Sequence, residues 1–300
     1  MVYRRKIILA LLQLFDGQLD KIRLQKLLFL FANKQALVHQ GGKAEYDFIP
    51  YKFGCYSYSA NADMTAMVTK GFLNEDEKTF AKKDQTDYLK QLKPTDLKLL
   101  QEVKANYGKM SATALMKHTY INFPFYAIKS EAAENILTKD ELEKVIKAKP
   151  KGNKTVLFTI GYEGISLEEY LVRLLKNDVK VLVDVRNNPL SMKYGFSKSQ
   201  LKKYCASLGM DYVHIPEVGI QSDQRQELNT QSDYDKLFAV YRKNNLSKTT
   251  THQQQILNLL KQHKRIALTC FEANICQCHR KHLAEAIENL PDFNYEVKHI

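Results

Sequence analysis

Residues 154–186, KTVLFTIGYEGISLEEYLVRLLKNDVKVLVDVR, decide the fold of this protein. The stretch begins and ends with a short apolar run rich in β-branched residues, and the segment between them (166–178) carries leucines at helical spacing. Ser166 provides an N-cap for that segment, and Glu169 occupies the capping-box position. A strand, a helix and a strand in this order predict two parallel strands joined by a helical crossover.

The same alternation continues to residue 300. Further strands are expected at 210–216, 265–272 and 293–300, and further helices at 197–209, 233–245, 250–263 and 279–289. Strands that alternate with helices indicate a parallel sheet covered by helices on both faces. We therefore expect a Rossmann-like α/β domain with a mostly parallel sheet of about five strands.

The first part of the chain has a different, mainly helical pattern. Two amphipathic segments are followed by a β-like run at 46–54, a helix at about 57–69 and a lysine-rich stretch that could form a β-ribbon. This order is expected of a winged helix-turn-helix variant. In that arrangement the 57–69 helix would face the major groove of DNA, and Lys78, Lys82 and Lys83 would contact phosphates. The alternative is a small helical domain whose lysines are merely solvated.

A linker separates the two patterns. Residues 148–154 contain three lysines, a proline and a glycine, a composition typical of a domain boundary. We therefore expect a helical, winged-helix-like DNA-binding domain at 1–150 and the α/β domain at 151–300.

Charge and cysteine content limit the function classes. The formal net charge is +12, and both halves are basic, with 24 Lys and Arg against 17 Asp and Glu in 1–150, and 21 against 16 in 151–300. Such a balance favours a polyanionic partner, and we expect nucleic acid, DNA rather than RNA.

Five cysteines in a chain of this length argue for a reducing compartment. No apolar run is long enough to span a bilayer, so we expect a cytoplasmic protein without a membrane partner. The sequence does not fix the oligomeric state.

Reactive side chains gather at one predicted edge of the sheet. Ligands of open α/β sheets bind outside the carboxyl ends of the strands. The residues at or just beyond those ends are Tyr162, Glu163, Asp184, Arg186, His214, Glu217, Cys270, Glu272, His279 and Arg280. A scatter of solvated charges would not concentrate there, so we expect one functional site at this edge.

Four motifs make the second half similar to a known family. In order they are TIGYEG, LVDVRNNPLSMKYGFSK, LGMDYVHIPEVG and LTCFEANICQCHRKHLAE, and the likeness extends over nearly all of residues 155–290. They resemble the bacterial family called domain of unknown function 488. The resemblance implies an α/β domain associated with DNA, and its signature positions fall on Asp184, Arg186, Cys270, Glu272, His279 and Arg280.

A second resemblance concerns roughly the first 90 residues. The motifs RLQKLLFLFANK and YDFIPYKFGCYSYSANADM resemble the antitoxin-like Panacea domains and related winged-helix modules. The aromatic-rich segment ending in Gly-Pro-Val that is associated with Panacea domains is missing here.

Arginines and carboxylates are the first candidates for chemistry at the sheet edge. Arg186 follows a strand and could hold a phosphate with two hydrogen bonds, or it could form a structural ion pair with Asp184. Arg280 lies in the first turn of a helix, where an anion is favoured, so the two arginines could form a phosphate clamp. Glu272 is the best candidate for a general acid or base, and Asp184 is a second carboxylate. A permanent pair between Glu272 and one of the arginines is the alternative.

Cysteine and histidine offer a different chemistry. Cys270 would be a nucleophile if His279 and the helix N-terminus lowered its pKa, although a cysteine in a strand is most often a small buried hydrophobe. Cys276, Cys278 and His279 offer three metal ligands, and Cys270 could be a fourth. The first three are too close in sequence for good tetrahedral geometry on a helix start, so no metal is expected.

Two further expectations concern ligands. Tyr162 and Glu163 could line the pocket, with Tyr162 stacked on a base. No glycine-rich phosphate loop occurs, so we expect neither NAD nor ATP, and no other cofactor is indicated.

These observations predict a nucleic-acid-processing protein, related to DNA repair or defence. Its carboxylate and arginine site would hydrolyse a glycosidic or phosphodiester bond, for example in removing a modified base. The alternative is a non-catalytic DNA-binding regulator, or antitoxin-like protein, whose α/β domain senses a nucleotide. A third possibility is a cysteine-based enzyme that acts on small acyl or sulfur compounds.

Overall fold

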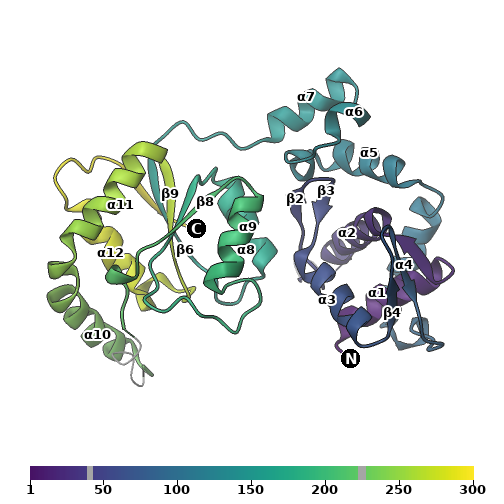
Figure 1. Cartoon of the computed structure of the whole chain (residues 1–300), viewed down its shortest axis with the longest axis horizontal. Coiled ribbons are helices and arrows are strands. Elements are labelled where there is room, and N and C mark those ends of the chain that lie inside the picture. Colours follow the sequence, from purple (N-terminus) through teal and green to yellow (C-terminus); the bar gives the residue numbers. More distant parts are fainter. Residues whose placement is uncertain (39–42, 222–227) are drawn as a thin grey trace. The chain divides into compact units, whose positions relative to one another are not determined.

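The computed structural model describes residues 1–38, 43–221 and 228–300. The chain divides into two compact units, Met1–Lys149 and Pro150–Ile300 (Figure 1). Each unit has its own hydrophobic core, and each is considered by itself below.

Unit 1 is mainly helical and contains two small antiparallel sheets. Its elements are α1 (Tyr3–Leu14), β1 (Gln18–Asp20), α2 (Lys21–Val38), β2 (Ile49–Tyr51), β3 (Gly54–Tyr56), α3 (Tyr58–Thr69), β4 (Leu73–Glu75), β5 (Thr79–Lys82), α4 (Pro94–Tyr107), α5 (Ala112–Asn122), α6 (Ala133–Ile136) and α7 (Lys139–Ala148). Strands β1, β5 and β4 form one sheet in that order, and β2 and β3 form a hairpin. The core lies around α1 and α2, because both helices bury nearly continuous apolar runs.

The helix expected at 57–69 is present as α3. Ser57 caps it by accepting a hydrogen bond from the Ala60 amide at 3.2 Å. The expected β-like run is instead the two strands β2 and β3, since Gly54 has a φ of +88° and reverses the chain. The expected β-ribbon is the β4–β5 hairpin.

Unit 2 is an α/β domain with five parallel strands, as the alternating pattern predicted. Its elements are β6 (Val156–Gly161), α8 (Leu167–Lys176), β7 (Val181–Asp184), α9 (Lys198–Ser207), β8 (Asp211–His214), α10 (Gln231–Asn244), α11 (Thr250–His263), β9 (Arg265–Cys270), α12 (His279–Glu288) and β10 (Glu296–His299). The strand order is β10-β6-β9-β7-β8, and every neighbouring pair is parallel.

Helices cover both faces of this sheet. Figure 1 shows α8 and α9 on one face and α11 and α12 on the other. Tyr170 of α8 packs against the first face, where its hydroxyl donates to Thr269 Oγ1 at 2.8 Å. Leu260 of α11 and Leu283 of α12 belong to the core on the opposite face. This burial on both faces explains why the three central strands β6, β7 and β9 carry nearly continuous apolar runs rather than alternating ones.

A search of the described residues for membrane-spanning helices finds none with the required length and apolar character.

Candidate functional site at the carboxyl edge of the sheet

The carboxyl ends of the central strands bring the predicted site residues to one edge. In the parallel register Gly161 of β6 lies opposite Cys270 of β9, and Asp184 of β7 lies opposite Thr269. The segments that leave these strands therefore begin side by side. Helix α12 starts at the same edge, because Cys270 Sγ lies within hydrogen-bond distance of His279.

Asp184 and Arg186 form a buried ion pair. Asp184 is fully buried, and its carboxylate accepts hydrogen bonds from Arg186 Nε at 2.8 Å and Arg186 Nη2 at 2.5 Å. Tyr212 donates a further hydrogen bond to the same carboxylate at 2.6 Å. Burial disfavours the charged guanidinium, yet the hydrogen bonds and charge of Asp184 prevail and raise the pKa of Arg186 above its ordinary value. This is the structural ion pair weighed above, so Asp184 is a positioning residue.

Arg186 is also committed to two other groups. Its Nη1 donates to the Tyr162 hydroxyl at 2.7 Å and to the Phe196 carbonyl at 3.0 Å. Tyr162 is only 2% exposed, and its ring stacks on Phe196 with the centroids 4.2 Å apart. Tyr162 is therefore a packing residue, and its predicted stacking on a base would require it to leave Phe196.

The neighbouring Glu163 is exposed and has a local role. Its Oε2 accepts a hydrogen bond from the Ala273 amide at 2.9 Å. The Tyr162 and Glu163 amides in turn donate to the Phe271 carbonyl at 3.0 and 2.9 Å. These bonds fix the turn after β6 to the turn after β9.

The reactive cluster of the edge consists of Cys270, Glu272 and His279. Cys270 Sγ lies 3.1 Å from Glu272 Oε2 and 3.5 Å from His279 Nδ1. His279 Nε2 lies 3.1 Å from the Val185 carbonyl. Because a carbonyl only accepts, Nε2 carries the proton, and in the neutral ring the Nδ1 lone pair faces the thiol. The three groups could therefore exchange protons with one another.

Cys278 joins this cluster, whereas Cys276 does not. Cys278 is 1% exposed and precedes His279 at the start of α12, and Cys276 is exposed. Burial raises the pKa of the Cys278 thiol well above its ordinary value, and Cys270 and Glu272 act in the same direction. Cys276 and Cys278, two residues apart in the sequence, thus lie one on the surface and one in the interior.

A cavity of about 250 Å³ opens beside the cluster. It is lined by Tyr162, Arg186, Asn187, Asn188, Leu190, Ser191, Ile220, Cys270 and Phe271. Glu272 and His279 line a much smaller recess that also contacts Ile220. Phe271 and Leu190 are 42% and 77% exposed, so large apolar side chains border the cavity. Among the described residues that line the cavity, Cys270 provides the only thiol. The neutral polar side chains of the lining, Asn187, Asn188 and Ser191, come from the segment after β7.

Comparison with known proteins agrees with the four motifs. Residues 166–287 match the model of a family described as Domain of unknown function DUF488. Unit 2 contains a DUF488 domain. No curated protein matches the chain. The resemblance of the first 90 residues to winged-helix modules stays a prediction.

Arg280 anchors the loop of the DUF488 domain that carries Glu272. Its guanidinium donates to the Glu272 carbonyl through Nη1 and to the Ala273 carbonyl at 3.2 Å through Nη2. Gly161 allows the close approach of this loop, because a Cβ at that position would lie 1.9 Å from the Glu272 carbonyl oxygen. Arg280 is 2% exposed. Like Arg186, it is engaged by groups of the protein, so the predicted phosphate clamp would require both arginines to exchange partners.

The remaining edge histidine of the DUF488 domain is also structural. His214 Nε2 lies 2.8 Å from the Arg186 carbonyl, and its Nδ1 lies 2.9 Å from Lys198 Nζ. Glu217, which follows β8, lies 3.9 Å from His252. Neither residue lines the 250 Å³ cavity.

The lysines predicted to contact DNA lie in the β4–β5 region of unit 1. Lys78, in the hairpin turn, and Lys83, after β5, are exposed. Lys82 instead forms an ion pair with Asp84 at 3.1 Å and has a side chain only 9% exposed. Helix α3, predicted to face the major groove, contains no lysine or arginine. Lys78 and Lys83 are therefore better placed than Lys82 for a phosphate.

Unit 1 also has a cavity of about 430 Å³. Its lining includes Lys21, Lys26, Lys52, Lys78, Tyr51 and Tyr56. Lys26 is 2% exposed and donates to the Cys55 carbonyl at 2.9 Å. Burial lowers the pKa of this lysine.

Sequence reasoning did not identify the polar lining of the cavity in the DUF488 domain. Asn187, Asn188 and Ser191 lie in the stretch NNPLS of the motif LVDVRNNPLSMKYGFSK, in which only Asp184 and Arg186 were predicted to be functional. The signal that could have found them is their position after β7, at the edge where a site was expected. The importance of Phe196 could not have been found in this way, because its role depends on contact with Tyr162.

Proposed function

We propose that the DUF488 domain is a hydrolase that acts on nucleic acid and cleaves a glycosidic bond. The observation that carries the proposal is the cluster of Cys270, Glu272 and His279 beside a cavity with neutral polar and apolar walls. Glu272 is partly exposed, so it is the carboxylate of this cluster that water can reach. It would act as the general base, with His279 and Cys270 orienting it.

The cavity lining favours a glycosidic bond over a phosphodiester bond. Both arginines at the edge are held by groups of the protein, which leaves little positive charge for a phosphate at the reacting centre. Asn187, Asn188 and Ser191 instead offer the neutral donors and acceptors that suit a base or a sugar. An exposed Phe271 beside them suits stacking on a base.

The proposed step is a simple hydrolysis. A water molecule attacks the anomeric carbon of the sugar and gives a proton to Glu272. The bond between that carbon and the base nitrogen breaks, and the base leaves with the electron pair and takes a proton from solvent. In unit 1 the exposed Lys78 and Lys83, and in the whole chain a net charge of +12, would support contact with the polyanion.

The test is a DNA assay with the full-length protein and two matched variants. Labelled single- and double-stranded DNA that carries modified or alkylated bases is incubated with wild type, Glu272→Gln and Glu285→Gln, the last being an exposed glutamate of α12. We expect alkali-labile abasic sites with wild type, a loss of about 100-fold or more in Glu272→Gln and little change in Glu285→Gln. Intact DNA with wild type, or full activity of Glu272→Gln, would refute the proposal.

A second candidate function is supported by one contact. Cys270 lines the cavity, and its Sγ lies 3.5 Å from Nδ1 of His279, the ring nitrogen that carries the lone pair. A thiol nucleophile and its general base are arranged in this way. A cysteine enzyme acting on small acyl or sulfur compounds would lose all activity on alkylation of Cys270 or in Cys270→Ser, whereas Glu272→Gln would be less damaging. The non-catalytic regulator predicts instead that nucleotide or DNA is bound unchanged and that Glu272→Gln still binds.

A further inference from the structure

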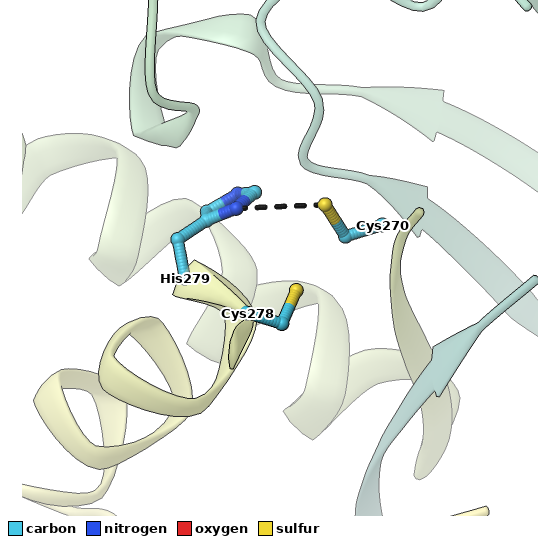
Figure 2. Close-up of side chains that lie close together, drawn as sticks. All are labelled: Cys270, Cys278 and His279. Atoms are coloured by element: carbon cyan, nitrogen blue, oxygen red, sulfur yellow. Dashed lines mark hydrogen bonds between the residues drawn. The ribbon is translucent and has the colours of Figure 1, made fainter. Parts of the chain in front are cut away.

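Three buried ligand groups converge at the start of α12. Cys270 is the last residue of β9, Cys278 precedes α12 and His279 is its first residue. One ligand atom from each lies within 4.8 Å of the ligand atoms of the other two. In Figure 2 the side chains of Cys278 and His279 extend from the helix start toward the thiol of Cys270. Two soft sulfurs and an imidazole nitrogen are the donor set that selects zinc over magnesium or calcium.

The spacing suits a tetrahedral ion. With zinc–sulfur bonds of about 2.3 Å and zinc–nitrogen bonds of about 2.0–2.1 Å, ligand atoms of a tetrahedral site stand roughly 3.5 Å apart. Cys270 Sγ and His279 Nδ1 are separated by 3.5 Å. Glu272 Oε2 lies 3.1 Å from Cys270 Sγ, next to the three ligand groups but not within 4.8 Å of all of them.

The surroundings orient these groups as metal ligands are usually oriented. The ring of His279 is fixed by the contact of Nε2 with the Val185 carbonyl at 3.1 Å, so that Nδ1 faces the sulfurs. Metal-binding histidines commonly donate their second ring N–H to such a carbonyl. Arg280 holds the backbone carbonyls of Glu272 and Ala273, which fixes the loop between Cys270 and Cys278.

We propose that Cys270, Cys278 and His279 bind one zinc ion and leave its fourth position open, with Glu272 beside the site rather than bound to the ion. The sequence argued against a metal because three of the four candidate ligands, Cys276, Cys278 and His279, lie within four residues of one another. The fold removes that objection, since Cys276 is exposed and the second sulfur comes from a strand end. The inference does not depend on the proposed hydrolase, because metal binding is measured without a substrate. It does oppose the cysteine enzyme, since a thiolate bound to zinc is not a free nucleophile.

The first measurement is zinc binding to the full-length protein in a phosphine reductant. The protein is freed of metal with a chelator, and Zn²⁺ is titrated in competition with a chromophoric chelator. We expect one equivalent in wild type and in Cys276→Ser, and affinity weaker by about 100-fold or more in Cys278→Ser, because loss of even an outer contact weakens metal sites by roughly 10- to 100-fold. No stoichiometric binding, or an equal loss in Cys276→Ser, would overturn the proposal.

A second measurement does not depend on the folding of a variant. Co²⁺ replaces Zn²⁺ in tetrahedral sites and reports its ligands in the visible and near-ultraviolet spectrum. Wild-type protein should give intense tetrahedral bands and thiolate-to-cobalt charge transfer, and added Zn²⁺ should abolish both. A weak octahedral spectrum without charge transfer would show that the two buried thiols do not bind the ion. Far-ultraviolet circular dichroism checks that Cys278→Ser is folded before its affinity is compared.

Discussion

Replacing Asp184 by asparagine should destabilise the DUF488 domain strongly. The substitution keeps the shape of the side chain but removes the charge that faces Arg186. In the native protein the carboxylate accepts hydrogen bonds from the Arg186 amide, Nε and Nη2 and from the Tyr212 hydroxyl, and it has no exposed surface. Asparagine would leave a buried guanidinium without its counter-ion.

The expected loss is large relative to total stability. Breaking a buried ion pair by changing one partner typically costs about 3–5 kcal/mol, because the other charge remains buried. That loss corresponds to a factor of roughly 100 to 5,000 in the folding equilibrium, at about 1.36 kcal/mol for each factor of ten. Total stabilities are only about 5–15 kcal/mol. The guanidinium of Arg186 would also lose its fixed orientation toward Tyr162, and the cavity wall would loosen.

Native-state hydrogen exchange read by mass spectrometry would measure this loss in unit 2 alone. Peptides from β6, β7 and β9 report the free energy of opening of the central sheet. The matched control is Glu296→Gln, which breaks the ion pair between Glu296 and Lys298. The two side chains of that pair are 44% and 50% exposed, respectively. The control should change stability by less than about 1 kcal/mol. A loss in Asp184→Asn no larger than in the control would refute the argument that this pair is a buried structural unit.

Two further predictions follow from close packing and from burial of charge. Gly161→Ala should destabilise the sheet edge by about 3 kcal/mol or more, since the new Cβ would overlap the Glu272 carbonyl oxygen. Gly164→Ala should cost only about 1–2 kcal/mol, because a Cβ there meets no atom within 4 Å and the cost comes from its φ of +74°. Chemical denaturation of both variants measures the difference, and equal losses would contradict it. Burial lowers the pKa of Lys26 in the folded protein below its ordinary value of 10.5. At pH values between these two pKa values the unfolded chain therefore binds more protons than the folded protein. The stability of wild type relative to Lys26→Met should therefore rise from pH 7 to pH 10; a constant or falling difference in urea unfolding would rule this out.

The periodicity of the sequence was sufficient to predict the architecture of unit 2. Apolar runs and amphipathic segments alternate from residue 154 onward, and each run became a strand of a five-stranded parallel sheet. The general rule for strand ends then placed Cys270, Glu272 and His279 at one edge, where the structure brings them into contact. Unit 1 was less predictable. Its strand β1 has only three residues and no periodicity to detect, and it exists because β5 pairs with it.

The partners of the charged residues could not be predicted in the same way. Arg186 and Arg280 were assigned to a phosphate because their positions suit an anion. The structure shows that Asp184, Tyr162 and backbone carbonyls already accept hydrogen bonds from both guanidinium groups, although Arg280 Nε is buried without a partner among the described residues. Whether an arginine faces a ligand or the protein depends on which carbonyls the neighbouring turns expose, and no local pattern records that.

The sequence by itself determined the class of fold, the edge at which reactive groups gather and the basic character of both halves. These features depend on local periodicity and composition, which are properties of short segments. The tertiary structure alone decided which groups touch: it joined Cys278 to Cys270, left Cys276 on the surface and bound both arginines internally. Such contacts form between residues from different elements, and distances of a few ångströms are set by how strands and turns pack together.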